Sequence, residues 1–433
     1  MKTSHRPVHR FSLFLIANSC ALLYAFVSLL ISQWWVRSLA LKTGYPSAWM
    51  IVLFIAIIPG YLNALLVAHL LVYRYQSVRM NRLNFPPITI LSAAFNEEDV
   101  IQETCRGIGQ QNYPGHQEVI FVDDGSSDRT VEELQASGLP NLKVIRSKHG
   151  GKAAALNLGL RHCKTEILVM IDADTFLYRN AVKRIVARLM SNPNYAAVAG
   201  QVLAKNERWN RLTRTQSWDY LLAISAVKRQ QGFFGGTLVA QGAFSVFRRS
   251  AILSVGGWEN RIGEDIVLSW ALLEKGYDIG YEPAAFAFTH VPTGFGGFAR
   301  QRQRWARGMI EGFKSHGRLL WKRRRYPAFF VFLNLFFPVV DFFYTFVFIP
   351  GVVLAFFGYY YIAGLMTLLV IPLNALIMFI MAQSQKKFMD FAGLRIRRNP
   401  IGLACYMLFY QILLSPICTV GYFKELIRWR RRW

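Results

Sequence analysis

The stretch Ile167-Leu168-Val169-Met170-Ile171-Asp172-Ala173-Asp174 decides the fold, because five apolar residues run directly into two carboxylates. A continuous apolar run of this length predicts a strand that is buried on both faces. Two aspartates one residue apart at a strand end can point the same way and hold one octahedral divalent ion. A single Asp-x-Asp pair also fits a solvated turn, so the neighbouring segments are needed to choose between the two interpretations.

Three further apolar runs of strand length precede this stretch, at residues 88–91, 118–122 and 142–145. Helix-length segments separate the runs, near residues 100–110, 130–137 and 152–162. Alternation of strands and helices predicts an α/β domain with a largely parallel sheet. Ligands of such sheets bind at the carboxyl ends of the strands, so we expect functional side chains there.

Polar residues next to the other predicted strands fit a nucleotide ligand. Asp123 and Asp124 directly follow the run at 118–122, and carboxylates at this place can hydrogen-bond a base or ribose or bind a hard cation. Lys152 follows Gly150-Gly151 at the start of a predicted helix, a pattern that suits a phosphate-bearing ligand. Gly-Gly-Lys is also a common entry to an ordinary helix.

A third acidic site, Gly263-Glu264-Asp265, precedes a helix-like run at residues 266–275. Aspartate is a good cap for a helix N-terminus, which is the simpler interpretation. The functional alternative makes Asp265 a general base that deprotonates an acceptor hydroxyl.

The segment Gln301-Arg302-Gln303-Arg304-Trp305 lies between the polar middle of the chain and its apolar last third. On a helix, Gln301, Arg304 and Trp305 share one face, which offers an amide, a guanidinium and an indole to something anionic and something flat. The alternative is an interfacial helix that only anchors the chain at a bilayer. If the shared face is functional, we expect anchoring to fall to the basic neighbours Arg300, Arg302, Arg307 and residues 322–325.

The composition indicates a membrane protein with one folded polar domain. The 433 residues are 53% hydrophobic, 15% aromatic and 17% charged, too apolar for an ordinary soluble protein. Much of the net charge of +25 flanks the apolar runs, as positive-inside topology predicts, so we do not interpret it as nucleic-acid binding. The five cysteines lack C-x-x-C spacing and support neither a zinc site nor a disulfide framework, which fits a reducing cytoplasm.

The apolar runs set the expected domain limits. The first run, residues 11–35, lacks a clear cleavage pattern and is interpreted as a retained anchor, and a second predicted span covers residues 49–73. The predicted regions are residues 1–80 with two membrane helices, 81–295 as the α/β domain, 296–326 as a basic amphipathic interface helix, and 327–433 as a C-terminal membrane region with a basic tail. Basic flanks place the N-terminus and the α/β domain on the cytoplasmic side.

The C-terminal membrane region poses a question of topology. Its apolar runs cover residues 327–357, 358–381 and 401–422, and the basic tail covers residues 428–433. Three full spans would leave that tail on the far side of the membrane, against the charge rule. Either the first or the last of these runs therefore contains an interfacial or re-entrant piece.

Taken in order, these motifs resemble the processive family-2 glycosyltransferases, the inverting membrane synthases of cellulose, chitin, hyaluronan and bacterial poly-N-acetylglucosamine. The ordered set is Asp-Asp-Gly-Ser at 123–126, Gly-Lys-x-x-Ala-Leu-Asn at 151–157, Asp-x-Asp at 172–174, Gln-Gly-Ala-Phe at 241–244, Gly-Glu-Asp at 263–265 and Gln-x-x-Arg-Trp at 301–305. The resemblance covers residues 87–305 and the layout of two spans before and several after. It implies a GT-A fold and a UDP-sugar donor.

The resemblance also implies a role for each matching residue. Asp265 corresponds to the catalytic base, and Asp174 to the metal ligand, where Mg²⁺ or Mn²⁺ is expected because all candidate ligands are oxygens. The nucleotide-sugar residues are Asp123, Asp124, Lys152, Asp172 and Arg304. The acceptor residues are Gly242, Ala243, Glu264, Gln301 and Trp305. Two positions depart from the family pattern: Gln241 replaces the usual Ser, and Gly263 replaces the usual Thr, which removes a hydroxyl beside the base.

The implied activity is that of a processive hexosyltransferase. It would polymerise a UDP-sugar, favoured as UDP-N-acetylglucosamine, at the cytoplasmic face of the plasma (inner) membrane and export the polysaccharide through its membrane helices. Its expected partners are the UDP-sugar, the growing polysaccharide and the lipid bilayer, with room for accessory export or regulatory subunits. Alternatives are a cellulose-type synthase that uses UDP-glucose and a non-processive enzyme with a lipid acceptor. A transporter with a nucleotide-binding domain would need ionisable residues in several spans, where they are sparse.

Overall fold

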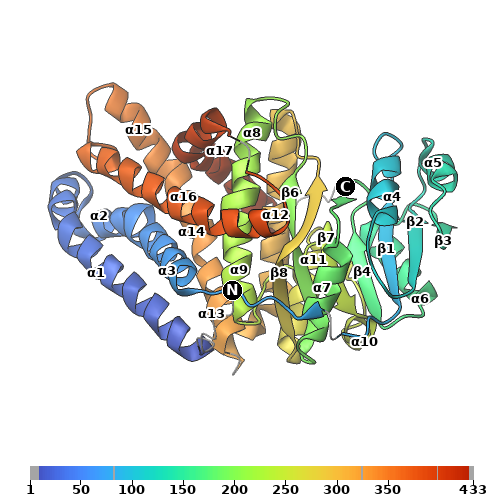
Figure 1. Ribbon diagram of the computed structural model, residues 1–433. Coiled ribbons are helices and arrows are strands. Elements are labelled where there is room, and N and C mark those ends of the chain that lie inside the picture. Colours follow the sequence, from blue (N-terminus) through green and yellow to red (C-terminus); the bar gives the residue numbers. More distant parts are fainter. Residues whose placement is uncertain (1–8, 81–82, 323–324, 397, 429–433) are drawn as a thin grey trace.

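The structure is a computed structural model that describes residues 9–80, 83–322, 325–396 and 398–428 (Figure 1). The ends of the two basic flanks, residues 1–8 and 429–433, lie outside the described residues, as do Arg323 and Arg324 of the predicted anchoring segment. Helices from both ends of the chain lie together on one side of an α/β domain that is formed by the middle of the chain (Figure 1).

An eight-stranded sheet forms the centre of the α/β domain, in the order β3-β2-β1-β4-β7-β6-β8-β5. The strands are β1 (Ile88–Ala94), β2 (Gln117–Asp123), β3 (Leu142–Arg146), β4 (Ile167–Ile171), β5 (Phe176–Leu177), β6 (Tyr195–Ala204), β7 (Phe244–Arg248) and β8 (Asp278–Thr289). Strands β3, β2, β1 and β4 are parallel, whereas β7 runs antiparallel to β4 and β6, and β5 antiparallel to β8. The α/β class is confirmed, and the parallel arrangement holds for the half of the sheet that contains the four predicted strands.

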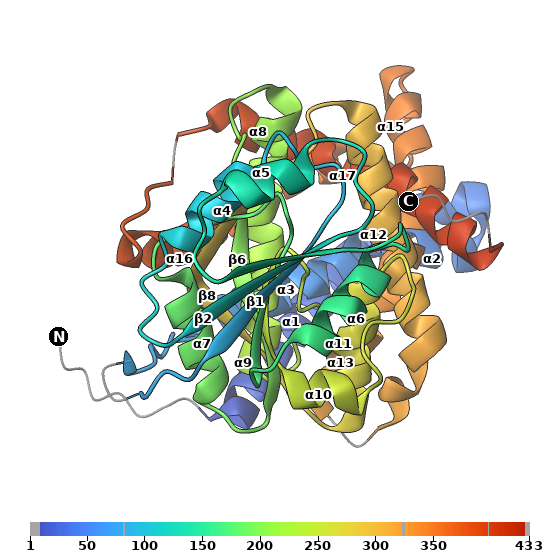
Figure 2. The ribbon, with the colours of Figure 1, turned by 90° about the vertical axis from the view of Figure 1, so that its right-hand side faces the viewer.

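Helices cover both faces of the sheet (Figure 2), so alternate residues of a strand enter different apolar cores. In β2, Ile120 and Val122 belong to one core, and Val119 and Phe121 belong to the other. The first core includes residues of α6 (Lys152–His162), α10 (Arg249–Ser254) and α11 (Glu264–Lys275); the second includes residues of α4 (Ile101–Gly109), α5 (Thr130–Ala136) and α7 (Ala181–Met190). Burial on both faces explains the continuous apolar runs at residues 119–122 of β2 and 167–171 of β4.

Two segments connect the α/β domain to the apolar helices. Between β6 and β7 the chain forms α8 (Arg211–Trp218), the π-helical η3 (Asp219–Ile224) and α9 (Ser225–Phe233). After β8 it forms α12 (Phe295–His316) and η4 (Gly317–Trp321). The prediction that residues 301–305 are helical is therefore confirmed, and α12 packs against α11 and against the last helix of the chain.

The apolar regions form long helices at both ends of the chain. The elements are α1 (Arg10–Thr43), α2 (Tyr45–Val52), η1 (Leu53–Ile57), α3 (Ile58–Val72), α13 (Arg325–Asn334), α14 (Phe336–Phe343), η5 (Tyr344–Phe348), α15 (Ile349–Phe356), α16 (Leu365–Phe391) and α17 (Pro400–Leu426). Among the described residues, four helical stretches are long and apolar enough to cross a membrane: Arg10–Thr43, Tyr45–Val72, Tyr326–Phe356 and Pro400–Leu426. The protein is therefore a membrane protein.

Helix α17 packs against α8, α12 and α14. At its start, Asn399 donates a hydrogen bond to the carbonyl oxygen of Arg214 (3.0 Å). Near its end, the Glu425 carboxylate lies 3.2 Å from Nη2 of Arg307 in α12. Helix α17 is thus fastened to α8 at its start and to α12 near its end.

Arg302 and Arg307 are not membrane anchors, and this expectation is wrong. Their side chains are only 4% and 7% exposed, respectively. Arg302 pairs with Asp219 at 2.9 Å, and Arg307 pairs with Glu425. A buried guanidinium requires a partner of this kind, and both partners lie too far along the chain for a local sequence pattern to reveal them.

Candidate functional site

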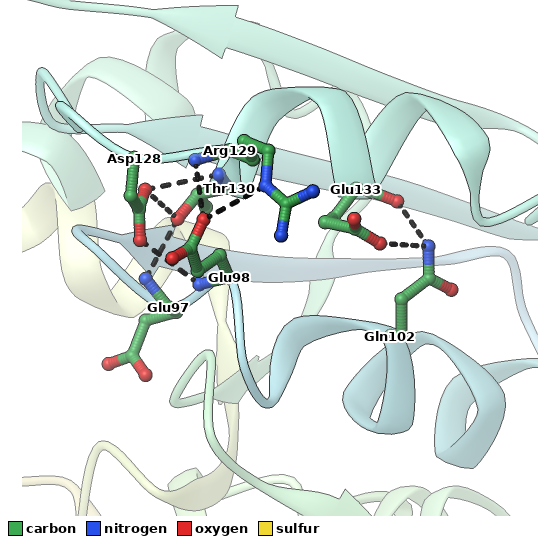
Figure 3. Close-up of polar contacts among 7 residues, drawn as sticks. All are labelled: Glu97, Glu98, Gln102, Asp128, Arg129, Thr130 and Glu133. Carbon is green, nitrogen blue, oxygen red and sulfur yellow. Dashed lines mark hydrogen bonds and ion pairs between the residues drawn. The ribbon is translucent and has the colours of Figure 1, made fainter.

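Two loops at the carboxyl ends of β1 and β2 form one wall of the candidate site. Asn96 adopts a left-handed conformation (φ +54°), and its side-chain oxygen accepts a hydrogen bond from the backbone N–H of Ser127 (2.9 Å). The backbone N–H of Glu97 donates to Oγ1 of Thr130 (2.8 Å), which in turn bonds Asp128 (Figure 3). These bonds fasten the loops together and leave the Glu97 side chain pointing away from them (Figure 3).

Glu97 was not predicted as a site residue. Burial raises its pKa to about 8, and the carboxylates of Asp174 and Asp172 add to the shift, so Glu97 lies near the Asp-x-Asp pair. A sequence signal existed, because β1 continues to Ala94, three residues beyond the predicted end at Leu91. With the correct strand end, the Asn-Glu pair lies at the edge of the sheet where ligands are expected.

Asp123 and Asp124 are both buried, and they have different contacts. The two carboxylate oxygens of Asp124 accept hydrogen bonds from the backbone N–H groups of Gly150 and Gly151, each at 2.9 Å. Asp123 accepts one from the N–H of Ser126 (3.2 Å). Asp124 therefore fixes the loop that leads into α6, while Asp123 shapes the turn after β2.

A pair of flat rings borders the same loops. Phe95, 43% exposed, stacks on His149 with ring centres 4.5 Å apart and an interplanar angle of 30°. Nδ1 of His149 also lies 3.0 Å from Oδ2 of Asp124. Neither ring belongs to a motif recognised in the sequence, although Phe95 directly precedes the Asn-Glu pair.

Lys152 brings three motifs together. Its ammonium Nζ lies 2.6 Å from Oδ1 of Asp172 and 3.2 Å from Oε1 of Glu264. Burial alone would lower the pKa of Lys152, but these two carboxylates raise it above its usual value. A Cβ atom at Gly242 would lie 2.6 Å from the same Nζ, so the absence of a side chain lets this loop approach the ammonium. The structure thus joins residues from the starts of α6 and α11, the loop after β4 and the loop before β7 at one point.

Asp174, the predicted metal ligand, faces the second half of the sheet. Its oxygens accept hydrogen bonds from Oγ1 of Thr289 (3.0 Å) and Oγ1 of Thr175 (3.3 Å). Burial raises its pKa, and the neighbouring Asp172 raises it further. Carboxylates crowded in this way favour a nearby cation.

The donor set fits a divalent ion that a substrate helps to hold. Within the described ranges, no three His, Cys, Asp or Glu side chains are close enough to hold a metal by themselves. Asp172 is engaged by Lys152, which leaves Asp174 as the carboxylate of the Asp-x-Asp pair for the ion. Mg²⁺ is commonly bound by one or two carboxylates together with substrate phosphates, so one protein carboxylate at this place is sufficient.

Asp265 lies in the first turn of α11, where Oδ1 accepts a hydrogen bond from the N–H of Ile266 (2.8 Å). Lys228 of α9 lies near it: burial lowers the pKa of this lysine to about 7, and the Asp265 carboxylate opposes the shift. Lys228 was not predicted, because the segment between β6 and β7 contains no recognised motif around it.

The close approach of α11 and α12 explains the missing threonine before Glu264. A Cβ atom on Gly263 would lie 2.4 Å from Cα of Gly308, too close for any side chain. The N–H of Gly263 also donates to Oε2 of Glu311 (2.9 Å). Glycine at position 263 therefore lacks the threonine hydroxyl but allows α11 and α12 to pack closely at Gly308. This contact holds the Gln-x-x-Arg-Trp segment of α12 beside the Gly-Glu-Asp motif.

Replacing Gly263 with threonine, the usual family residue, should impair this protein. The new side chain must push α12 away at Gly308, because backbone atoms cannot yield as a flexible side chain can. We expect sugar transfer to fall at least about tenfold, with a lower melting temperature. Gly317→Ala is the matched control, since a Cβ at Gly317 meets nothing within 4 Å. Full activity of Gly263→Thr would show that the helix contact is dispensable.

The Gln-x-x-Arg-Trp residues lie on α12 with different exposures. Gln301 is half-buried, Arg304 is exposed, and the Trp305 side chain is 36% exposed. The Trp305 ring lies 6.2 Å from the ring of Tyr220 in η3. Trp305 thus stands beside residues of the same connecting segment that contains Lys228.

The acceptor-side loop contains one residue in the site and two with structural contacts. Gly242 lies against Lys152, as described above. Gln241 donates a hydrogen bond from Nε2 to the carbonyl oxygen of Gly200 (2.7 Å), which accounts for glutamine at this position. Ala243 is partly buried against the second apolar core.

The chain is similar to known glycosyltransferases in sequence and in fold. Residues 89–256 match the family model described as Glycosyl transferase family 2. The chain is 34% identical over 245 residues to the poly-beta-1,6-N-acetyl-D-glucosamine synthase of Staphylococcus aureus (strain MSSA476), a match that covers 56% of this chain and 59% of that protein. The protein of the same name from Staphylococcus epidermidis is 34% identical over 224 residues, covering 51% and 54%. The chain thus spans little more than half the length of these relatives.

The structure is also similar to a mannosyltransferase from Pyrobaculum calidifontis, PcManGT, solved in complex with GDP-Man and Mn²⁺. The TM-score is 0.61 at 18% sequence identity, and the likeness covers 88% of this chain and 99% of that one. At this identity the likeness concerns the fold, so the predicted GT-A-like fold is confirmed. Within this fold, residues 89–256 are similar to the glycosyl transferase family 2 domain.

Proposed function

We propose that this protein is a membrane-bound, inverting glycosyltransferase that polymerises N-acetylglucosamine from UDP-N-acetylglucosamine. The observation that carries the proposal is the cluster around Lys152, in which the start of α6 contacts the Asp-x-Asp pair at 2.6 Å and the Gly-Glu-Asp motif at 3.2 Å. The staphylococcal relatives, named as poly-beta-1,6-N-acetyl-D-glucosamine synthases, make this sugar and a 1,6 linkage the first choice.

Each part of the site has a task in this reaction. Asp265 takes the proton from an acceptor hydroxyl as that oxygen attacks the anomeric carbon, opposite the departing diphosphate, which inverts the configuration. Lys152 holds Asp172 in place and adds positive charge beside the diphosphate, and Arg304 of α12 adds more. A Mg²⁺ or Mn²⁺ ion at Asp174 would neutralise charge on the diphosphate. Trp305 offers a flat surface to the terminal sugar of the acceptor.

The arrangement of the apolar helices supports export of the polymer through the membrane beside the α/β domain. In this proposal the α/β domain faces the cytoplasm, where UDP-sugars are available, and the chain passes the plasma membrane several times. The apolar helices lie directly beside the domain (Figure 1), so the product would enter the bilayer region close to the acceptor site.

The test is to incubate purified membranes with UDP-N-acetylglucosamine or UDP-glucose and to measure both UDP release and polymer. We expect release with the first donor and a product of many N-acetylhexosamine units by mass spectrometry, with 1,6 linkages by methylation analysis. A glucose polymer would establish the cellulose-type alternative. A single sugar on a lipid would establish the non-processive one, and absence of UDP release with both donors would contradict the proposal.

A further inference from the structure

A buried arginine lies against the Trp305 ring. The guanidinium carbon of Arg302 is 4.2 Å from the centre of the indole, and the Arg302 side chain is 4% exposed. A planar guanidinium stacks well on an aromatic face, and the attraction grows when both groups are shielded from water. Trp305 is itself 36% exposed, so part of its surface remains available to a ligand.

Asp219 holds this arginine from the other side. Its Oδ2 lies 2.9 Å from Nη1 of Arg302, and the Asp219 side chain is buried. Asp219 begins the π-helical segment η3, and the next residue, Tyr220, contacts the Trp305 ring. The π-helical turn therefore supplies both the anion that fixes Arg302 and an aromatic neighbour for Trp305.

The last helix of the chain completes the support. The hydroxyl of Tyr410 in α17 donates a hydrogen bond to the same Oδ2 of Asp219, at 2.8 Å. The ring of Tyr410 also lies 5.8 Å from the Arg302 guanidinium. One carboxylate thus joins α17 to α12 directly under the indole.

We propose that Arg302 is a positioning residue that fixes the Trp305 ring for the acceptor sugar, and that Tyr410 of α17 holds Arg302 in place through Asp219. The inference rests on the proposed function, in which Trp305 carries the acceptor. A tryptophan that is already fixed loses less side-chain freedom when a sugar stacks on it, so binding of the acceptor is stronger.

Further contacts keep α17 in register with α12. Nζ of Lys424 donates to Oε1 of Gln303 at 2.8 Å. A Cβ atom on Gly421 would lie 2.9 Å from the carbonyl oxygen of Gln303, so the two helices touch there. Because Gln303 follows Arg302 directly, any shift of α17 along α12 must act on the residues next to the indole.

Tyr410→Phe tests the proposal with a change of one oxygen atom. Hydrogen bonds to charged groups contribute enough that we expect the KM for an N-acetylglucosamine oligosaccharide acceptor to rise about tenfold, with shorter polymers. Binding of UDP should not change, because the donor residues are untouched. Tyr406→Phe is the matched control: its ring lies 5.1 Å from that of Tyr410, and its hydroxyl has no hydrogen bond within the described part of the chain.

A second measurement follows the indole itself. The measurement is fluorine NMR of protein that contains 5-fluorotryptophan. The Trp305 resonance is assigned as the one that is lost in Trp305→Phe. We expect this resonance to shift or broaden in Tyr410→Phe but not in Tyr406→Phe. Arg302→Lys retains the positive charge beside Asp219, so this variant should keep more of the wild-type affinity for the acceptor than Arg302→Met does. An unchanged Trp305 resonance and acceptor KM in Tyr410→Phe would overturn the inference. A wild-type protein that makes no polymer would instead contradict the proposed function, while the fluorine signal still tests the positioning.

Discussion

Replacing Asp265 with asparagine should lower the rate of sugar transfer by roughly 10²- to 10⁴-fold, the usual contribution of a general base. The amide has nearly the same shape, and its oxygen can still accept the hydrogen bond from the N–H of Ile266, so α11 should begin as before. What is lost is the ability to take a proton from the acceptor hydroxyl. The measurement is UDP release and polymer formation by purified membranes.

Two comparisons make the Asp265→Asn result specific. Binding of UDP should stay near the wild-type value, because Lys152, Asp172 and Glu264 are unchanged. Glu274→Gln, near the other end of the same helix, is the control for a lost carboxylate, and it should retain most of the activity because Glu274 pairs with His316 well away from the site. Near wild-type elongation by Asp265→Asn would show that another group is the base.

Removing the metal should stop the reaction almost as completely. We expect EDTA to lower transfer at least about 10²-fold and added Mg²⁺ or Mn²⁺ to restore it, because a divalent ion supplies several kcal/mol of charge stabilisation at a departing diphosphate. Asp174→Asn should raise the metal concentration needed for half-maximal activity. Its hydrogen bonds from Thr289 and Thr175 can persist with the amide oxygen, so the local fold should remain.

A variant of the neighbouring aspartate, Asp172, distinguishes an effect on metal binding from an effect on donor binding. Asp172 is paired with Lys152, so Asp172→Asn should raise the KM for the UDP-sugar more than it raises the metal requirement. If Asp174→Asn needs no more metal than the wild type, the ion is held elsewhere. Titration of Mg²⁺ at several fixed donor concentrations distinguishes these outcomes.

The sequence predicted the parts of the fold that depend on local patterns. Continuous apolar runs identified β1 to β4, and the carboxylates and turn residues after them include several that the structure brings together around Lys152. The antiparallel β7 was not identified, because its pairing with β4 and β6 joins residues that are far apart in the chain. Strand ends also mattered: three missing residues at the end of β1 were enough to hide Glu97.

Residues of the acceptor side were harder to predict because their environment is formed by long-range contacts. The sequence pattern predicts that Arg302 is a surface anchor, and only the position of Asp219 in the structure shows that Arg302 is buried and paired. Gly263 was recognised as a departure from the family pattern, yet the reason, the backbone of Gly308 at 2.4 Å from its would-be Cβ, requires the packing of two helices. The ion-pair partner of a charged side chain cannot be predicted from local sequence when that partner lies on another helix or strand.

The contacts of α17 have a consequence for the order in which the site is completed during synthesis. The residues that surround Lys152 lie at positions 94–174, apart from Gly242 and Glu264, and all of them leave the ribosome before Trp305 does. The indole at position 305 acquires the support of α17 only when Tyr410 has been made, later in translation. A nascent chain would therefore contain the residues that hold a nucleotide before Trp305 is positioned for a sugar polymer, and elongation would begin only after α17 has been made.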